Sequence, residues 1–458
     1  MMVKIKSIQL NKIFLFLTIL LGCFPILSFG MRSFFTIIWS CLGIYLFFLE
    51  RKTDKLDSEI IYFLLPYLFI TISIFYSTNI EYGLGKLIKM LSFIIFPLIF
   101  YLNRDFFSKK YVYQILDFFL ISVLILVFYQ IIIIFFNFDF VTSTLSLSEI
   151  KANGFNSLNE ITNEKLEQIK LRRFRNYIKK ISNTHSTYQG LWVGFSIFYL
   201  GLKSFDSKNK IFKIVSLVLI MLLFSWLFLI SARMPFFALI ISLILTVFLF
   251  FKISSSNKLL LISLPIFFLL SLLSFKNPIS LRIKEYYQTG TSLLEKSSIP
   301  SEYNSSNVRN GIYFCDLKLI KEKSFLGVGI GDIQDELNTC YKEIIGAKIY
   351  TWHAYNSHNQ FAFFWIASGF FGLLSFILLI IISFRKAFKN KNYILFFISS
   401  ITFFIFMSEN LLERSDGLFF YCFLISLLFF NKIKKYLIIF HLLPKKLIFL
   451  QTNSNQTE

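Results

Sequence analysis

The chain has 458 residues, of which 56% are hydrophobic and 19% aromatic, and a formal net charge of +21. A soluble fold could not bury this much apolar side chain, so we expect an all-α protein with many transmembrane helices. The positive charges lie in short connections between apolar runs, so they indicate membrane topology rather than nucleic-acid binding.

Apolar runs of membrane-crossing length predict about twelve transmembrane helices. The predicted spans are 13–29, 33–49, 59–77, 87–102, 112–136, 186–202, 212–230, 235–251, 258–275, 359–383, 393–408 and 416–430. The first run has a basic front like a signal peptide, but no small-residue cleavage site follows it, so we expect it to be retained.

These spans divide the chain into six segments. Residues 1–136 hold helices one to five, 186–275 hold helices six to nine, and 359–430 hold helices ten to twelve. Two long polar loops, 137–185 and 276–358, separate these groups, and a basic tail, 431–458, follows the last helix. No further domain is expected after that helix.

The distribution of Lys and Arg between short connections predicts the orientation. One set of connections is rich in cations, among them Arg51, Lys52, Lys55, Arg104, Lys109, Lys110, Lys203, Lys208, Lys210, Arg385 and Lys386. The other set carries little beyond Arg32, Lys86, Arg233 and Arg414. We therefore expect a multi-pass protein of a bacterial inner membrane, with both termini cytoplasmic and both long loops extracytoplasmic.

The long loops leave two structural questions open. Residues Glu164–Lys180 form a basic, helix-like run that fits either a membrane-surface helix or a solvated one. Cys315 and Cys340 both fall in the second loop, where they are either a disulfide or two free thiols. No Cys/His group has metal-ligand spacing, so neither a metal site nor a cofactor is predicted.

The spans contain almost no charged residues, which argues against an ion-coupled transporter. The unusual polar residues lie at the extracytoplasmic ends of spans instead. Arg233, in the turn Ser231-Ala232-Arg233, fits either a lipid-phosphate anchor or a clamp on a substrate phosphate.

Two further polar motifs lie near the end of the second loop. Arg309-Asn310-Gly311 precedes the glycine-rich run Gly327-Val328-Gly329-Ile330-Gly331, which suits close backbone approach to a ligand or a plain turn. His358 leads into the tenth span, where it fits either a general base or an interfacial hydrogen-bonding residue.

In their order along residues 185–430, these motifs resemble the O-antigen ligase/polymerase superfamily. The most specific part is His358-Asn359-Gln360-Phe361 followed by Gly369 and Gly372. The Ser-x-Arg turn at 231–233, the segments described around Arg309 and Gly329, the run His185-Ser186-Thr187-Tyr188 and the turn Ser408–Arg414 also match. Departures are Ala362, where Leu is common, and Met234-Pro235 after the first arginine.

The resemblance implies transfer of a glycan from undecaprenyl pyrophosphate to a sugar hydroxyl, with inversion and without metal or nucleotide sugar. It implies that His358 is the catalytic base and that Arg309 and Arg233 stabilise the departing pyrophosphate. The implied substrate-binding residues are His185, Tyr188, Gly329, Gly331, His353, Asn359 and Glu409. The implied partners are the lipid-linked donor, a lipopolysaccharide core or growing glycan as acceptor, and membrane lipids.

Three other functions remain open at this point. A surface-polysaccharide or exopolysaccharide polymerase of the same superfamily shares the motifs, whereas a protein O-glycosyltransferase is disfavoured because no extra domain is expected after the last span. A lipid-linked glycan flippase or exporter can also have about twelve spans. Such a protein should line a central cavity with charges, which the spans lack.

Overall fold

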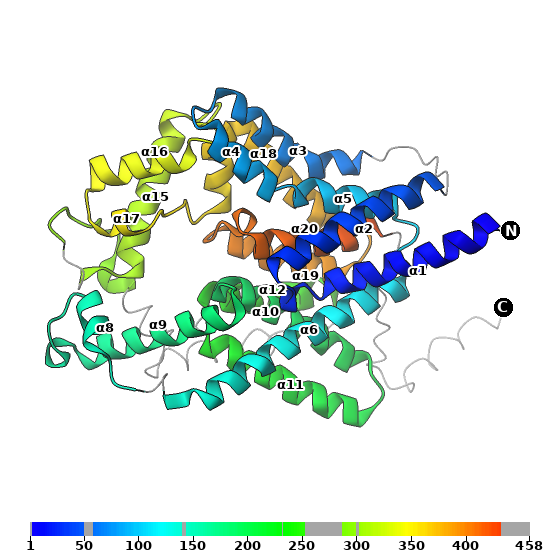
Figure 1. The fold of residues 1–458 in the computed structure, drawn as a ribbon, viewed down its shortest axis with the longest axis horizontal. Coiled ribbons are helices and arrows are strands. Elements are labelled where there is room, and N and C mark those ends of the chain that lie inside the picture. Colours follow the sequence, from blue (N-terminus) through cyan, green and yellow to red (C-terminus); the bar gives the residue numbers. More distant parts are fainter. Residues whose placement is uncertain are drawn as a thin grey trace, which may run out of the picture.

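The computed structural model describes residues 2–49, 58–139, 143–230, 232–251, 286–298 and 302–431, and it contains helices but no strand within them (Figure 1). This confirms the all-α class. The main helices are α1 (Met2–Gly22), α2 (Phe29–Leu49), α3 (Glu59–Ser73), α4 (Ile80–Lys89), α5 (Ser92–Leu102), α6 (Lys109–Phe136), α8 (Leu147–Ala152), α9 (Asn163–Ser182), α10 (Ser186–Asp206), α11 (Lys210–Leu229), α12 (Arg233–Phe250), α15 (Ser305–Glu322), α16 (Ile333–Cys340), α17 (Ile349–Trp352), α18 (Gln360–Lys389), α19 (Tyr393–Phe406) and α20 (Ser415–Phe430).

Within the described residues, seven segments are helical, long and apolar enough to cross a membrane. They are Phe29–Leu49, Glu59–Tyr76, Ile80–Leu102, Lys109–Phe136, Lys210–Leu229, Arg233–Phe250 and Gln360–Lys389. Three shorter apolar helices, Ile8–Gly22, Tyr393–Phe406 and Ser415–Phe430, coincide with the predicted first, eleventh and twelfth spans. The chain is therefore a helical membrane protein, and the count of twelve spans stays a prediction.

Two predicted spans need separate comment. The span predicted at 186–202 is helix α10, which is not among the seven apolar helices. Every residue of α10 from Thr187 to Leu200 is buried, including Gln189, so this helix has no need of a uniformly apolar, lipid-facing surface. The span predicted at 258–275 lies outside the described residues.

Helices α10, α19 and α20 form the centre of the bundle. In α20 every residue from Gly417 to Phe430 is buried, and α20 packs against α5 while α19 packs against α12. Aromatic rings fill the interior: Phe198 of α10 stacks on Phe397 of α19 with ring centroids 3.8 Å apart. Peripheral helices instead expose apolar side chains, such as Phe48 on α2 at 70%, as a lipid-facing surface requires.

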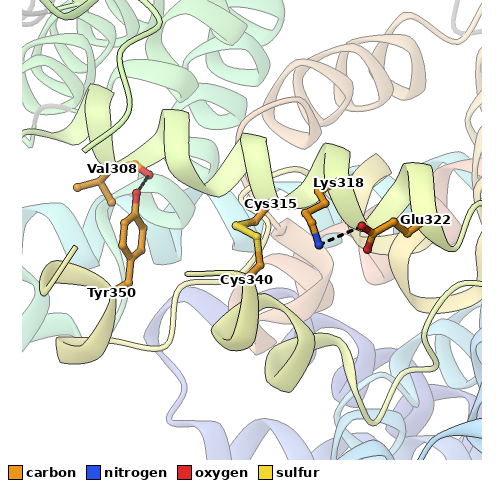
Figure 2. Close-up of a disulfide and its surroundings, with 6 residues drawn as sticks. All are labelled: Val308, Cys315, Lys318, Glu322, Cys340 and Tyr350. Carbon is orange, nitrogen blue, oxygen red and sulfur yellow. Dashed lines mark hydrogen bonds and ion pairs between the residues drawn. A yellow bond between two sulfur atoms is a disulfide. The ribbon is translucent and has the colours of Figure 1, made fainter. Parts of the chain in front are cut away.

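The second long loop folds into helices α15, α16 and α17, which pack beside α3, α4 and α18 at one end of the bundle (Figure 1). We call this end the outer end. A disulfide between Cys315 and Cys340 joins α15 to α16, which answers the question left open by the sequence (Figure 2). The first long loop contains α9, which confirms the helix predicted at Glu164–Lys180.

The glycine-rich segment that follows α15 docks on α18. The Val328 and Gly329 N–H groups donate to the carbonyl oxygens of Ile366 and Ala367, at 2.7 Å and 3.0 Å. These carbonyls lie where α18 is interrupted, because Ser368 and Gly369 have non-helical backbone angles. The segment therefore supplies donors to backbone groups that α18 does not use itself.

The same segment also docks on the connection between α3 and α4. The Ile330 and Gly331 N–H groups donate to the hydroxyls of Ser73 and Ser77, at 3.0 Å and 3.1 Å. Asp332 accepts hydrogen bonds from the N–H groups of Thr78 and Asn79, both at 2.8 Å. Through these contacts the outer helices are fixed to both the first and the last parts of the bundle.

Candidate active site

Arg309 lies in the first turns of α15, whose backbone is anchored from the side. The Tyr350 hydroxyl donates to the Val308 carbonyl oxygen at 2.8 Å (Figure 2). Gly311 makes this contact possible, because a Cβ at that position would lie 2.1 Å from the same hydroxyl. The Arg309-Asn310-Gly311 motif therefore combines an arginine with the glycine that lets its turn be held in place.

His358 lies in the loop directly before α18, and its backbone has a φ of 45°, a left-handed conformation that non-glycine residues rarely adopt. Its N–H group donates to the Asn356 side chain at 3.3 Å. The next residue, Asn359, is the N-cap of α18 and accepts from the N–H groups of Phe361 and Ala362. Asn359 therefore caps α18, and its predicted contact with substrate stays a prediction.

Glu409, in the turn between α19 and α20, brings the two loops together. Its Oε1 accepts from Nη2 of Arg309 at 3.2 Å, and its Oε2 lies 3.3 Å from Nδ1 of His358. Burial raises the pKa of Glu409, but the hydrogen bond and charge of His358, with the charges of Arg309 and His185, outweigh it and hold the pKa below its usual value. The carboxylate is therefore ionised at neutral pH and shared between a guanidinium and an imidazole.

Glu413 fixes the same turn from its other side. Its carboxylate forms an ion pair with Lys86 of α4 and accepts hydrogen bonds from Asn356 at 2.7 Å and Asn410 at 3.0 Å. Asn410 also exchanges hydrogen bonds with the Ser357 hydroxyl. The residues that follow Glu409 are thus hydrogen-bonded to the residues that precede His358.

His185 and Tyr188 lie at the start of α10, close to this cluster. The His185 ring is 5.9 Å from the Tyr188 ring and interacts electrostatically with Glu409. Desolvation lowers the pKa of His185, Glu409 opposes this, and the positive charges of Lys179 and Arg175 on α9 lower it again. The net lowering favours a neutral His185 at neutral pH.

Arg233 is the first residue of α12, at the point where α12 meets α10. A Cβ at Gly190 of α10 would lie 2.7 Å from the Ala232 Cβ and 2.9 Å from the Pro235 Cβ, so the two helix starts are in direct contact. Arg233 itself is partly buried. The structure thus places Arg233 at the outer end, beside the helix that His185 begins.

Tyr313 is a site residue that the sequence analysis did not single out. It lies one turn after Arg309 on α15. Burial raises its pKa, the Arg309 charge lowers it, and Glu409 raises it, with a net increase. Its position four residues after Arg309 is the sequence signal that places it on the same helix face.

Three predicted substrate-binding residues lie elsewhere. His353 is exposed and lines a separate cavity of about 340 Å³ with Tyr341 and Lys342. The N–H groups of Gly329 and Gly331 donate within the protein, and a Cβ on Gly329 would lie 2.3 Å from the Ser77 hydroxyl. The structure gives these glycines a packing role, and their contact with substrate stays a prediction.

The arrangement defines what the cluster can do chemically. An ionised carboxylate can only accept hydrogen bonds, so Nδ1 of His358 is the protonated nitrogen beside it, and in a neutral ring Nε2 is the proton acceptor. The Arg309 guanidinium has further donors for an anionic group such as phosphate. The cluster therefore combines a proton acceptor with an anion-binding group.

Comparison with known families identifies a match over about a third of the chain. Residues 217–377 match the O-antigen ligase family. The matched segment contains Arg233, Arg309 and His358, whereas His185 and Glu409 lie outside it. A search of curated proteins found no match. The family match confirms the predicted resemblance of this chain to the O-antigen ligase/polymerase superfamily.

Proposed function

We propose that the protein is a glycosyltransferase of the O-antigen ligase type that acts on the extracytoplasmic face of a bacterial inner membrane. It transfers a glycan from undecaprenyl pyrophosphate to a sugar hydroxyl, on the lipopolysaccharide core or on a growing chain. One observation carries the proposal: Arg309 and His358 contact the two oxygens of a single buried carboxylate, Glu409. A proton acceptor and an anion-binding group therefore lie side by side.

The proposed reaction is a direct displacement at the anomeric carbon of the donor. Nε2 of His358 takes the proton of the acceptor hydroxyl, and the acceptor oxygen forms a bond to that carbon. The bond from the carbon to the pyrophosphate oxygen breaks, and its electron pair leaves with undecaprenyl pyrophosphate. Attack from the face opposite the leaving group inverts the anomeric configuration.

Two arginines stabilise the leaving group in this proposal. Arg309 and Arg233 supply fixed positive charge for the pyrophosphate, and a guanidinium can bind phosphate oxygens through two parallel hydrogen bonds. His185 and Tyr188, at the start of α10, contact the transferred sugar in this proposal, which the interaction of His185 with Glu409 supports. The catalytic step needs no nucleotide sugar, because the lipid-linked donor is already activated.

A cavity beside His185 offers room for the part of the donor's lipid tail nearest the pyrophosphate. It has a volume of about 420 Å³ and is lined partly by apolar residues of the α1–α2 connection and α6, and by Thr184, which precedes His185. Its apolar lining includes Pro25, Ile26, Leu27, Phe29, Leu126 and Tyr129. The lining also contains polar and charged residues, among them Arg32 and Asp416, so the cavity suits a substrate with both an apolar part and a charged head.

The test compares His358→Ala and Arg309→Ala with a matched control, Lys318→Ala. Lys318 also lies on α15, but it is exposed and pairs with Glu322 on the helix surface (Figure 2). In a strain that lacks the wild-type gene, we expect all three variants at normal membrane levels. The two site variants should abolish glycan transfer and accumulate lipid-linked donor on the extracytoplasmic face, while the control transfers normally.

The pattern of surface glycans separates the alternatives. Loss of every chain on the lipid core indicates a ligase, whereas single repeat units left on the core indicate a polymerase. Accumulation of the donor on the cytoplasmic face would support a flippase instead. Near-normal transfer by His358→Ala would remove His358 as the base.

A further inference from the structure

We propose that Glu409 is the positioning residue of this site, which orients His358 for proton abstraction and holds Arg309 beside it. The inference rests on the proposed function and adds to it a residue from outside the family match, which ends at residue 377. The sequence analysis gave Glu409 a substrate contact. The contacts of its carboxylate favour a different role.

Each oxygen of Glu409 already has a protein partner. Oε1 accepts from Arg309 at 3.2 Å and Oε2 lies 3.3 Å from His358 Nδ1. The side chain of Glu409 is only 13% exposed. A carboxylate with both oxygens occupied and little exposed surface is a poor ligand for a sugar hydroxyl, but it suits the orientation of its two partners.

The contact with Nδ1 determines what His358 can do. A hydrogen bond from Nδ1–H to a carboxylate fixes both the tautomer and the orientation of an imidazole ring. The lone pair is then on Nε2, which points away from Glu409, and this nitrogen accepts the acceptor proton. The negative carboxylate also stabilises the imidazolium that forms when the proton arrives.

The contact with Arg309 completes the arrangement. A carboxylate near a bound pyrophosphate would repel it, but the Arg309 charge next to Oε1 compensates for this. The same hydrogen bond fixes one edge of the guanidinium, so its remaining donors face in a defined direction. One carboxylate therefore sets the geometry of both the base and the phosphate-binding group.

The backbone around Glu409 is built to hold this position. The next residue, Asn410, bonds to Ser357, which precedes His358. The Leu412 N–H donates to the Gln360 side chain at 2.8 Å, on the other side of His358. The turn and the His358 loop thus move as one unit, which is what a positioning residue requires.

The experiment uses the full-length protein in detergent or lipid. The single variants are Glu409→Ala, Glu409→Gln and Glu409→Asp. A double variant combines Glu409→Ala with His358→Ala. Glu322→Gln is the matched control, because Glu322 forms an exposed pair with Lys318 on α15. Thermal unfolding identifies variants that fail to fold. Transfer kinetics are measured with a lipid-linked donor and a glycan acceptor.

We expect Glu409→Ala to lower kcat by about 10²–10⁴-fold with a smaller change in the KM for acceptor, because a general base loses its orientation. Glu409→Gln should lower kcat by less than Glu409→Ala does, since the Gln amide oxygen still accepts a hydrogen bond from Nδ1–H of His358. In the His358→Ala background, Glu409→Ala should cause a much smaller further loss of the residual kcat, because only its contact with Arg309 is then left to lose.

A spectroscopic measurement distinguishes this role from a structural one. Nitrogen-15 labelling of the histidines, assigned by comparison with His358→Ala, should show His358 protonated on Nδ1 in the wild type and a mixture of tautomers in Glu409→Ala. The control Glu322→Gln should leave the spectrum and the kinetics unchanged.

Three results would overturn the inference while leaving the proposed function intact. They are a folded Glu409→Ala variant with normal kcat, a loss confined to the KM for donor, and an equal further loss of kcat in the His358→Ala background. Normal transfer by His358→Ala alone would instead overturn the proposed base.

Discussion

Lys86 and Glu413, which are 327 residues apart in the chain, form an ion pair beneath the candidate active site. Their side chains are only 16% and 7% exposed. Glu413 also accepts hydrogen bonds from Asn356, two residues before His358, and from Asn410, the residue after Glu409. The pair therefore connects α4, in the part of the chain outside the family match, to the loops of the candidate active site.

Removal of Lys86 tests this connection. Lys86→Met leaves the Glu413 carboxylate buried without its cation, and breaking a buried pair in this way costs about 3–5 kcal/mol. We expect a lower unfolding temperature and a large loss of transfer activity, measured in the same detergent preparation. The double variant Lys86→Met/Glu413→Gln should recover part of the stability.

The exposed pair of Lys318 and Glu322 is the control for Lys86→Met, since an exposed ion pair contributes at most about 1 kcal/mol. Lys318→Met should therefore unfold at nearly the wild-type temperature. Equal stability of Lys86→Met and the wild type would show that the buried pair does not hold the site together.

The disulfide offers a second test. Cys315 and Cys340 are separated by 25 residues, and closing a loop of this size stabilises a fold by about 3 kcal/mol. Cys315→Ser/Cys340→Ser should lower the unfolding temperature of the outer helices and reduce transfer, because α15 carries Arg309. The same unfolding temperature for the oxidised wild type, the reduced wild type and the double variant would contradict this role.

The docking of the glycine-rich segment gives a third prediction. A Cβ at Gly331 would lie 2.3 Å from the Asn79 carbonyl oxygen. A backbone atom cannot shift to relieve this clash without a cost in folding free energy. Gly331→Ala should therefore lower the unfolding temperature and weaken the contact between the outer helices and α4. Hydrogen exchange at residues 73–79 and 327–332 measures this directly.

Gly85 is a matched control for Gly331→Ala. It lies on α4, and an added Cβ would meet nothing within 4 Å. Alanine is favoured over glycine inside a helix by about 1 kcal/mol, so Gly85→Ala should leave stability unchanged or slightly higher. Similar losses in both variants would mean that the close contact at Gly331 is not the cause.

Acid should loosen the helix pair α8–α9. Glu149 pairs with Arg173 at 2.6 Å, and this hydrogen bond, offset in part by burial, lowers the Glu149 pKa from 4.5 to about 2. A lowered pKa stabilises the folded state fully above the ordinary value and loses this contribution as pH falls through the folded value. Protection of α8–α9 from hydrogen exchange, corrected for intrinsic rates, should fall between about pH 5 and pH 2.

Glu149→Gln should remove this pH dependence. Its α8–α9 protection should already be lower at neutral pH and should change little on acidification. A variant that keeps the wild-type pH dependence would assign the effect to another carboxyl group.

The sequence predicted the helical class and most spans because lipid-facing helices must be apolar over a membrane-crossing length. It was less informative for α10, where Gln189 and Gln130 bond to each other in the interior instead of leaving an apolar surface. Burial of a paired polar group cannot be read from hydropathy, since the pairing residue is on another helix.

The candidate site, too, could be predicted from the sequence only in part. The order of Arg309, His358 and Glu409 along the chain predicted which residues gather at the outer end, but not that one carboxylate joins the other two. The contact of Asn359 and the glycines with substrate stays a prediction, because helix capping and close packing use the same residue types as ligand binding. Lys86 was interpreted only as a topology residue, because its partner is far away in sequence.

The interruption of α18 at Ser368 and Gly369 has a consequence for biogenesis. Residues 327–331 are synthesised before α18, because they precede it in the chain. The carbonyls of Ile366 and Ala367 therefore accept hydrogen bonds from a chain segment that has already been synthesised. Without those donors the broken helix would leave polar backbone groups exposed to hydrocarbon. We therefore expect α18 to be stable in lipid only after residues 327–331 have docked on it, so that its insertion is coupled to folding.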